Sequence, residues 1–310
     1  MNKLTLQFAI LFLAAVVHGD DAKKPKNTPV KKSTEAVVAK DDVVVSKQEY
    51  LDAVREAKAA GFEWECDDTT GQIQQGGDSA QKKETGRAPQ RKLNMEEVSD
   101  LGRYRDMLRR LRPTELNVFG CENLDGLMGL TSLQKLGLNF CPALQNLDGL
   151  KGLTGLRSFI LLGCSALQNV DGLKDLTGLQ TLLIRGCPAL QNVGGLKGLT
   201  GLRSLVLSEC PALQNVDGLK DLTGLHLLIL NQSPALQNVD GLKGLTRLQG
   251  IDLSGCPALQ NVDGLKGLTD LKNLQLGGSR KIPAAALREL RAALPNTDIT
   301  FPDGTKNPPQ

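Results

Sequence analysis

Cysteines recur at nearly constant spacing from residue 121 onward. The later intervals are 23 residues or twice that, two serines (Ser233 and Ser279) fill the remaining places, and the cysteines are Cys121, Cys141, Cys164, Cys187, Cys210 and Cys256. Regularly spaced cysteines outside the cytosol can form disulfides or bind zinc. The column therefore raises the question of redox or metal chemistry.

A structural role fits this cysteine column better. Cysteines that recur once per repeat point the same way into the repeat, where a buried thiol gives a weak hydrogen bond to a turn carbonyl. Serine supplies a hydroxyl donor there but neither a disulfide nor a good zinc ligand, so Ser233 and Ser279 favour the donor role. We predict a structural ladder without metal or cofactor, with Cys66 as the seventh cysteine outside the column and disulfide or metal chemistry as the alternative.

Acidic and basic residues also recur in columns. The acidic column is Asp148, Asp171, Asp217, Asp240 and Asp263, and the basic column is Lys151, Lys174, Lys197, Lys220, Lys243 and Lys266. A calcium site needs about six to eight oxygens converging on one point, and a single column offers too few. Asp-Gly is also a favourable turn pair. The columns therefore predict a solvated outer face.

Catalytic chemistry finds little support in the sequence. His226 is the one histidine after residue 18, and no nucleophile motif surrounds it, so a triad has one possible base. The stretch GGLKGLTGL belongs to the repeated unit and is not a phosphate-binding loop. We predict no enzyme activity. An enzyme whose chemistry lies in residues 46–112 remains a distant alternative.

Composition and the N-terminus restrict the classes of protein further. The 310 residues carry a net charge of +3, too small for a nucleic-acid footprint, and only 3% are aromatic, so leucine must build the core. Lys3 followed by an apolar run from Leu4 to Val17 is typical of a signal peptide. That run is shorter than the about 20 residues of a membrane span. We predict export, with no integral span after cleavage.

Leucines define a repeat of 23 residues. Units start at Leu133, Leu156, Leu179, Leu202, Leu225, Leu248 and Leu271. A fixed period in the twenties indicates a solenoid. Each unit opens with alternating leucines, as in LRSLVL at 202–207, and continues with leucine or valine every third residue. Alternation predicts a strand and three-residue spacing predicts a 3₁₀-like or extended return, so the stacked units form one parallel sheet with eight candidate strands.

This pattern, Leu-x-x-Leu-x-Leu-x-x-Cys-x-x-Leu, resembles the leucine-rich repeat with internalin-like spacing, over residues 113 to 279. The resemblance implies an α/β solenoid with a parallel sheet on its concave face, short convex returns and helical caps. It also implies a protein-binding scaffold, since this is the family's common role.

Variable strand positions facing away from the leucines are the candidate binding residues. Four of them are aliphatic on consecutive units, two more aliphatic residues extend the patch, and polar residues surround it; the candidates are Ile160, Leu162, Leu183, Arg185, Val206, Glu209, Leu227, Ile229 and Asp252. Strand propensity or cover by the N-terminal segment would also explain the aliphatic residues. We predict partner binding there.

Composition divides the chain into segments. We predict a signal peptide (1–19), a disordered linker (20–45), a short helical element (46–66), a flexible linker (67–93), an N-terminal cap helix (94–112), the repeats (113–279), a C-terminal cap (280–301) and a disordered tail (302–310). The cap helix begins at Asn94 and covers the exposed edge of the repeat core.

These features together predict an exported, non-enzymatic scaffold that binds a protein, or a glycan, on its concave face. It would be secreted, periplasmic or at the cell surface. The alternative is a structural protein of the cell envelope that associates with itself through the same patch.

Overall fold

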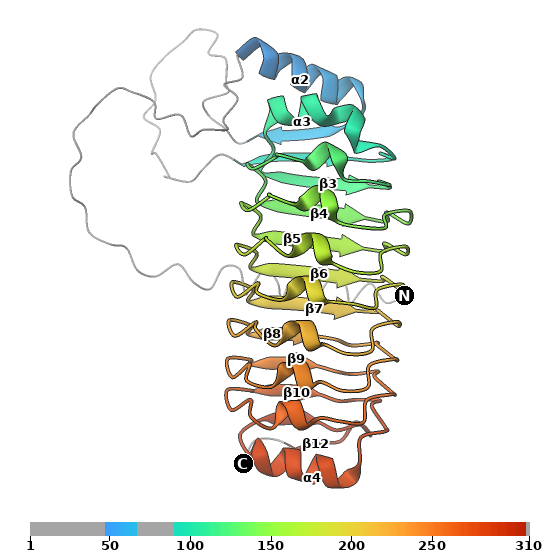
Figure 1. Cartoon of the computed structure of the whole chain (residues 1–310), viewed down its shortest axis with the longest axis vertical. Coiled ribbons are helices and arrows are strands. Elements are labelled where there is room, and N and C mark those ends of the chain that lie inside the picture. The colour runs from blue at the N-terminus through green and yellow to red at the C-terminus, as the bar shows by residue number, and fades with distance from the viewer. Residues whose placement is uncertain (1–46, 67–89, 308–310) are drawn as a thin grey trace, which may run out of the picture. The chain divides into compact units, whose positions relative to one another are not determined.

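A computed structural model describes residues 47–66 and 90–307, which form one elongated sheet with all strands in sequence order (Figure 1). The sheet has twelve strands; β2 to β11 run parallel, and β1 and β12 pair antiparallel at the two ends. The predicted signal peptide and first linker, and residues 67–89 of the second linker, lie outside the described residues.

The strands alternate with short helices. The strands are β1 (Glu63–Cys66), β2 (Arg91–Met95), β3 (Glu115–Phe119), β4 (Lys135–Asn139), β5 (Ser158–Leu162), β6 (Thr181–Arg185), β7 (Ser204–Ser208), β8 (Leu227–Ile229), β9 (Gly250–Asp252), β10 (Asn273–Gln275), β11 (Asp298–Thr300) and β12 (Lys306–Asn307). The α-helices are α2 (Lys47–Ala59), α3 (Arg105–Leu111) and α4 (Ala284–Ala293). The eight predicted strands are β3 to β10.

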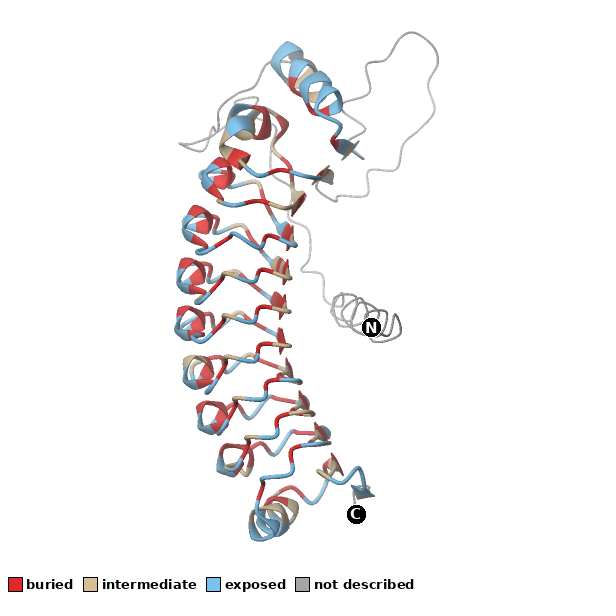
Figure 2. Ribbon diagram, turned by 90° about the vertical axis from the view of Figure 1, so that its right-hand side faces the viewer, coloured by how far each residue is buried: buried red, intermediate tan, exposed pale blue. Residues whose placement is uncertain are grey.

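Each coil consists of a strand, a turn and one 3₁₀ turn on the opposite side. The 3₁₀ helices are η1 (Leu101–Tyr104), η2 (Asp125–Leu127), η3 (Asp148–Leu150), η4 (Asp171–Leu173), η5 (Gly194–Leu196), η6 (Asp217–Leu219), η7 (Asp240–Leu242) and η8 (Asp263–Leu265). Figure 2 places the strands along the inner side of the curve and the 3₁₀ helices along the outer side. The predicted leucine-rich-repeat solenoid with compact convex returns is confirmed.

Asparagine side chains start the 3₁₀ turns. The Asn169 Oδ1 accepts a hydrogen bond from the backbone N–H of Asp171 at 3.1 Å, and Asn146 and Asn261 make the same contact in their coils at 3.1 and 2.8 Å. An asparagine that accepts from the backbone two residues on mimics a turn and satisfies an orphan donor. The Asn-x-Asp part of the repeated phrase is therefore a capping device.

The sequence indicates that the glycine of each Asp-Gly pair makes a turn, but in the structure this glycine lets neighbouring coils touch. Gly172 lies inside η4 and lacks the positive φ of a glycine turn. A Cβ built on it would lie 2.2 Å from the carbonyl oxygen of Leu147 in the preceding coil. The same contact recurs at Gly149, Gly195 and Gly241, at 2.1 to 2.3 Å. Glycine is required there because neighbouring coils touch, and not because the chain turns.

The N-terminal cap differs from the predicted helix over 94–112. Residues 91–95 form β2, and the helix α3 begins only at Arg105. Leu93 and Met95 are both fully buried, so period-two burial overrides the helical pattern. The Asp100 Oδ1 then accepts from the Gly102 N–H at 2.8 Å and starts η1, six residues after Asn94.

The segment over 46–66 completes this cap. Helix α2 buries Ala53 and Ala57 and packs on α3, where Arg110 pairs with Glu56. Phe62 belongs to the core and meets Tyr104 edge to face, with ring centroids 4.9 Å apart. The helical element over 46–66, for which the sequence predicts no role, therefore covers the first coil.

The segment over 280–301, predicted as the C-terminal cap, contains α4 and β11. The predicted disordered tail is wrong for residues 302–307, which turn back so that β12 pairs with β11. The Asp303 Oδ1 accepts from the Thr305 N–H and Oγ1 at 2.9 and 2.7 Å, and the Phe301 N–H donates to the Thr305 carbonyl at 2.8 Å. This turn ends the sheet.

The glycine contacts lead to a stability prediction. Gly172→Ala should lower the free energy of unfolding by about 1–3 kcal/mol, because the new methyl group meets the backbone of the preceding coil. Gly267→Ala is the control, since no atom lies within 4 Å of its built Cβ and its φ is not positive, so its stability should change by less than about 0.5 kcal/mol. Urea unfolding of both variants measures the difference. Equal stabilities would contradict the role of close coil contacts.

Candidate functional site

The strand residues divide cleanly between the core and the concave face. In β6, Leu182 and Ile184 are fully buried in the core, and Thr181, Leu183 and Arg185 alternate with them on the other face. The parallel register is unbroken from β3 to β10, so equivalent residues of successive coils lie side by side. Rows of side chains therefore run along the sheet.

One such row is aliphatic. Ile160, Leu183, Val206 and Ile229 are register partners on β5 to β8, and we call them the aliphatic row. Asp252 ends the row on β9, and its Oδ1 accepts from the Ser254 N–H at 2.9 Å. The structure thus brings the four predicted residues together on one surface.

The aliphatic row is unevenly exposed. Leu183 and Val206 are 7% and 4% exposed although neither belongs to the core cluster, whereas Ile160 and Ile229 are half-buried. The two outer isoleucines are therefore the members that offer contact area, and they are the better positions for substitution.

Leu162 and Leu227 lie in the rows on either side. Leu162 is the register partner of Arg185 and Leu227 that of Ser204, so the two leucines occupy opposite corners of the patch. Both are half-buried. With the aliphatic row they give an apolar surface across four strands.

Arg185 and Glu209 form an ion pair at the edge of this surface. The Arg185 Nε and Nη2 donate to the Glu209 Oε1 at 3.1 and 2.6 Å, and the side chains are 24% and 37% exposed. A partly exposed pair contributes at most about 1 kcal/mol to stability. Its main effect is to fix two charged side chains beside the apolar patch.

A left-handed backbone position follows each of the strands β3 to β10. Its residues all have positive φ: Gly120, Phe140, Gly163, Gly186, Glu209, Gln232, Gly255 and Gly278. Left-handed geometry costs a residue other than glycine about 1 kcal/mol. Because five coils use glycine there, the fold does not require Phe140, Glu209 or Gln232.

Phe140 is the aromatic residue of this column, and our sequence-based site omits it. Its side chain is 66% exposed, and its N–H donates to the Leu162 carbonyl at 2.7 Å, which places it beside the apolar patch. A large aromatic in a strained and exposed position is a candidate anchor for a partner. Aligning the units on their cysteines exposes it, because the other aligned residues are mostly glycine.

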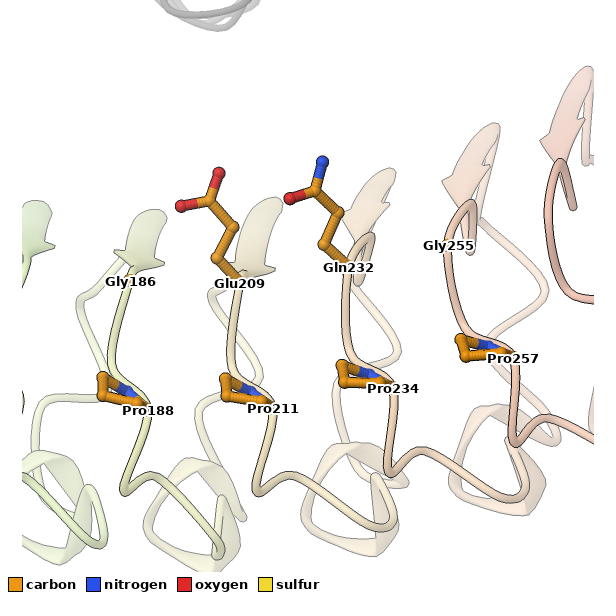
Figure 3. A pocket seen from close by; sticks show the side chains of 8 residues that line it. All are labelled: Gly186, Pro188, Glu209, Pro211, Gln232, Pro234, Gly255 and Pro257. Atoms are coloured by element: carbon orange, nitrogen blue, oxygen red, sulfur yellow. The ribbon is translucent and has the colours of Figure 1, made fainter. Parts of the chain in front are cut away.

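Beyond the same strand ends, prolines form a shallow groove of about 530 Å³, lined by Gly186, Pro188, Glu209, Pro211, Gln232, Pro234, Gly255 and Pro257. In Figure 3 the prolines stack in register, and the Glu209 and Gln232 side chains point away from them. Since the groove is open and carries few polar groups, it lacks the enclosure of a small-molecule site.

The cysteine ladder has the geometry of weak donors. The six cysteines are fully buried, and the Cys187 and Cys210 thiols donate to the Arg185 and Ser208 carbonyls at 3.7 and 3.4 Å. Burial raises the pKa of Cys210 to about 12 and that of Cys256 to about 11, which keeps these thiols protonated. The arrangement is consistent with a structural role.

Chemistry-bearing residues do not otherwise converge. Within residues 47–66 and 90–307, no three His, Cys, Asp or Glu side chains are placed to hold a metal ion. His226 is half-buried beside the start of β8. In the same described ranges, none of the helices is both long enough and apolar enough to cross a bilayer.

The comparisons with known proteins agree with the fold. The Toll–Spatzle complex of Drosophila is 18% identical over 68% of this chain and 30% of that chain, with a TM-score of 0.50. Internalin C2 of Listeria monocytogenes is 24% identical over 57% and 71%, with a TM-score of 0.43. The leucine-rich repeat domain of the type III effector XopL is 20% identical over 68% and 76%, with a TM-score of 0.43.

Comparison with family models and with curated proteins gave no match.

The two serines of the ladder lead to a prediction. The Ser233 hydroxyl is buried without a hydrogen-bond partner, whereas the Ser279 hydroxyl donates to the Leu253 carbonyl at 2.8 Å. Ser233→Cys should raise the free energy of unfolding by about 1 kcal/mol, because it removes an unsatisfied buried hydroxyl. Ser279→Cys is the matched control and should give no gain. Thermal melts compare them, and an equal gain in both would rule out this explanation.

Proposed function

Since this chain is a leucine-rich-repeat protein by its fold, we propose that it is an exported, non-enzymatic scaffold that binds a protein partner on its concave face. The observation that carries the proposal is the set of half-buried apolar residues on β5 and β8, with the exposed Phe140 beside it. Accessible apolar residues that gather on one face outside the core are typical of binding sites.

A protein suits this surface better than a glycan does. The aliphatic row offers no hydrogen-bonding groups, and recognition of sugar hydroxyls would need them. The polar groups lie around it, in Arg185, Glu209 and Asp252. An apolar centre with a polar rim is the usual anatomy of a protein interface. In the similar Drosophila structure, Toll is in complex with Spatzle.

Export is the second part of the proposal. It is supported by the basic residue and apolar run of residues 1–19, which are typical of a signal peptide. The protein would then act in the periplasm, at the cell surface or after secretion.

Charges in the aliphatic row should weaken binding. Ile160→Asp with Ile229→Asp should weaken binding of a partner recovered by crosslinking in the native compartment at least tenfold, about 1.4 kcal/mol, because a buried carboxylate would be unpaired. Both residues lie outside the core cluster, so the fold should persist. Met128→Asp is the control, since Met128 is an exposed apolar residue next to η2. Unchanged affinity in the folded double variant would refute the site.

Phe140→Gly separates binding from folding. Glycine is the residue that most coils use at this left-handed position, so the melting temperature should stay constant or rise slightly. Loss of an aromatic anchor should weaken binding by about 2 kcal/mol, or about 30-fold. Isothermal titration with the same partner measures it, and full affinity would exclude Phe140 from the interface.

Self-association through the same surface, as in a structural envelope protein, is the competing function. Light scattering over a concentration series distinguishes the two. A constant monomer mass supports a different partner. Growth in mass that Ile160→Asp abolishes would show that the partner is a second copy.

A further inference from the structure

Two ladder cysteines are in direct contact. The Cys121 and Cys141 sulfurs lie 3.1 Å apart, and both residues are fully buried. The two sulfurs are not bonded to each other in the structure. The Cys141 thiol also donates to the Asn139 carbonyl at 3.5 Å, the same backbone contact that Cys164 makes with Leu162 at 3.7 Å. The contact between the Cys121 and Cys141 sulfurs is therefore what distinguishes this pair within the column.

The spacing of this pair is also different. Cys121 and Cys141 are 20 residues apart, whereas Cys141, Cys164, Cys187 and Cys210 follow at intervals of 23. The short interval in the sequence and the contact between the sulfurs thus both distinguish the first pair from the rest of the column.

We propose that Cys121 and Cys141 form a disulfide that joins the first two coils and stabilises the N-terminal end of the solenoid in an oxidising compartment. The backbone is already in position. Phe119 and Asn139 are register partners on β3 and β4. Cys121 lies two residues after Phe119, and Cys141 lies two residues after Asn139. Neighbouring strands lie about 4.8 Å apart, within the Cα separation of about 4.4–6.8 Å that disulfides need.

The bond requires an oxidant, and a small-molecule disulfide supplies it. The thiolate of Cys141 attacks one sulfur of oxidised glutathione and displaces the first glutathione thiolate, which leaves a mixed disulfide. The thiolate of Cys121 then attacks the Cys141 sulfur and displaces the second. The two protons of the cysteines pass to the two glutathione thiolates, and two electrons pass to the oxidant. Because both sulfurs are buried, exchange takes place during folding or local opening of these coils.

Peptide mapping tests the bond directly. The full chain is refolded from denaturant in a buffer of oxidised and reduced glutathione, its remaining thiols are alkylated in denaturant, and it is digested with trypsin without reduction. Each ladder cysteine lies on its own tryptic peptide, with Cys121 on 111–135 and Cys141 on 136–151. We expect these two peptides to be linked and the other five cysteines to be alkylated. Alkylation of all seven cysteines, or a bond from Cys141 to Cys164, overturns the proposal.

Thermal unfolding tests the stabilising role. A reductant should lower the melting temperature of the refolded chain by several degrees, because the crosslink restricts the unfolded chain. Cys187→Ser, a ladder variant outside the pair, should keep this response, and Cys121→Ser should lose it. A melting temperature of the unsubstituted chain that is equal with and without reductant overturns the role. Neither measurement depends on the proposed partner.

Discussion

Direct contact between neighbouring coils at the glycine of the 3₁₀ turns η2 to η8 is the constraint on which the rest of the structure depends. At Gly172 the carbonyl oxygen of Leu147 occupies the space that any other side chain would fill. The convex side can thus pack as closely as the strands on the concave side, where hydrogen bonds fix the spacing near 4.8 Å. With both sides close, the leucines between them form one continuous core.

The residues that build the coils are different from the residues that form the concave surface. The residues that hold a coil together recur in every unit, whereas the residues of the aliphatic row and the left-handed column vary. Variation at these positions leaves the leucines, the capping asparagines and the glycines unchanged. A surface fixed before binding loses little ordering entropy on association. The fold can therefore change the residues of this surface without changing its stability much.

Periodicity made most of the fold predictable, and local exceptions to periodicity explain the rest. Leu136 and Leu138 repeat the strand pattern of every coil, so the sheet and its register could be read from one unit. The helix over 94–112 was wrong because Leu93 and Met95 have strand burial, although the segment contains helix-forming residues. The tail over 302–310 was predicted disordered because its composition hides the turn that Asp303 makes with Thr305.

The candidate site was predictable only in part. The aliphatic row follows from alternation alone, and its residues do lie together. The exposure of each member does not follow from the sequence, since alternation places all four residues on one face, yet Leu183 and Val206 are buried and Ile160 and Ile229 are half-buried. Phe140 was missed because it stands out by its positive φ, and the alternation of apolar residues along a strand gives no information on backbone angles.

The antiparallel strands at the two ends of the sheet limit its growth. β1 and β12 run against the ten strands between them, and β1 carries the charged Glu63 and Glu65. An antiparallel edge presents hydrogen-bonding groups at a different spacing from a parallel one, so another solenoid cannot continue the ladder in register. A structure made of nearly identical units, which otherwise resembles one segment of a fibre, is thereby kept at a fixed length.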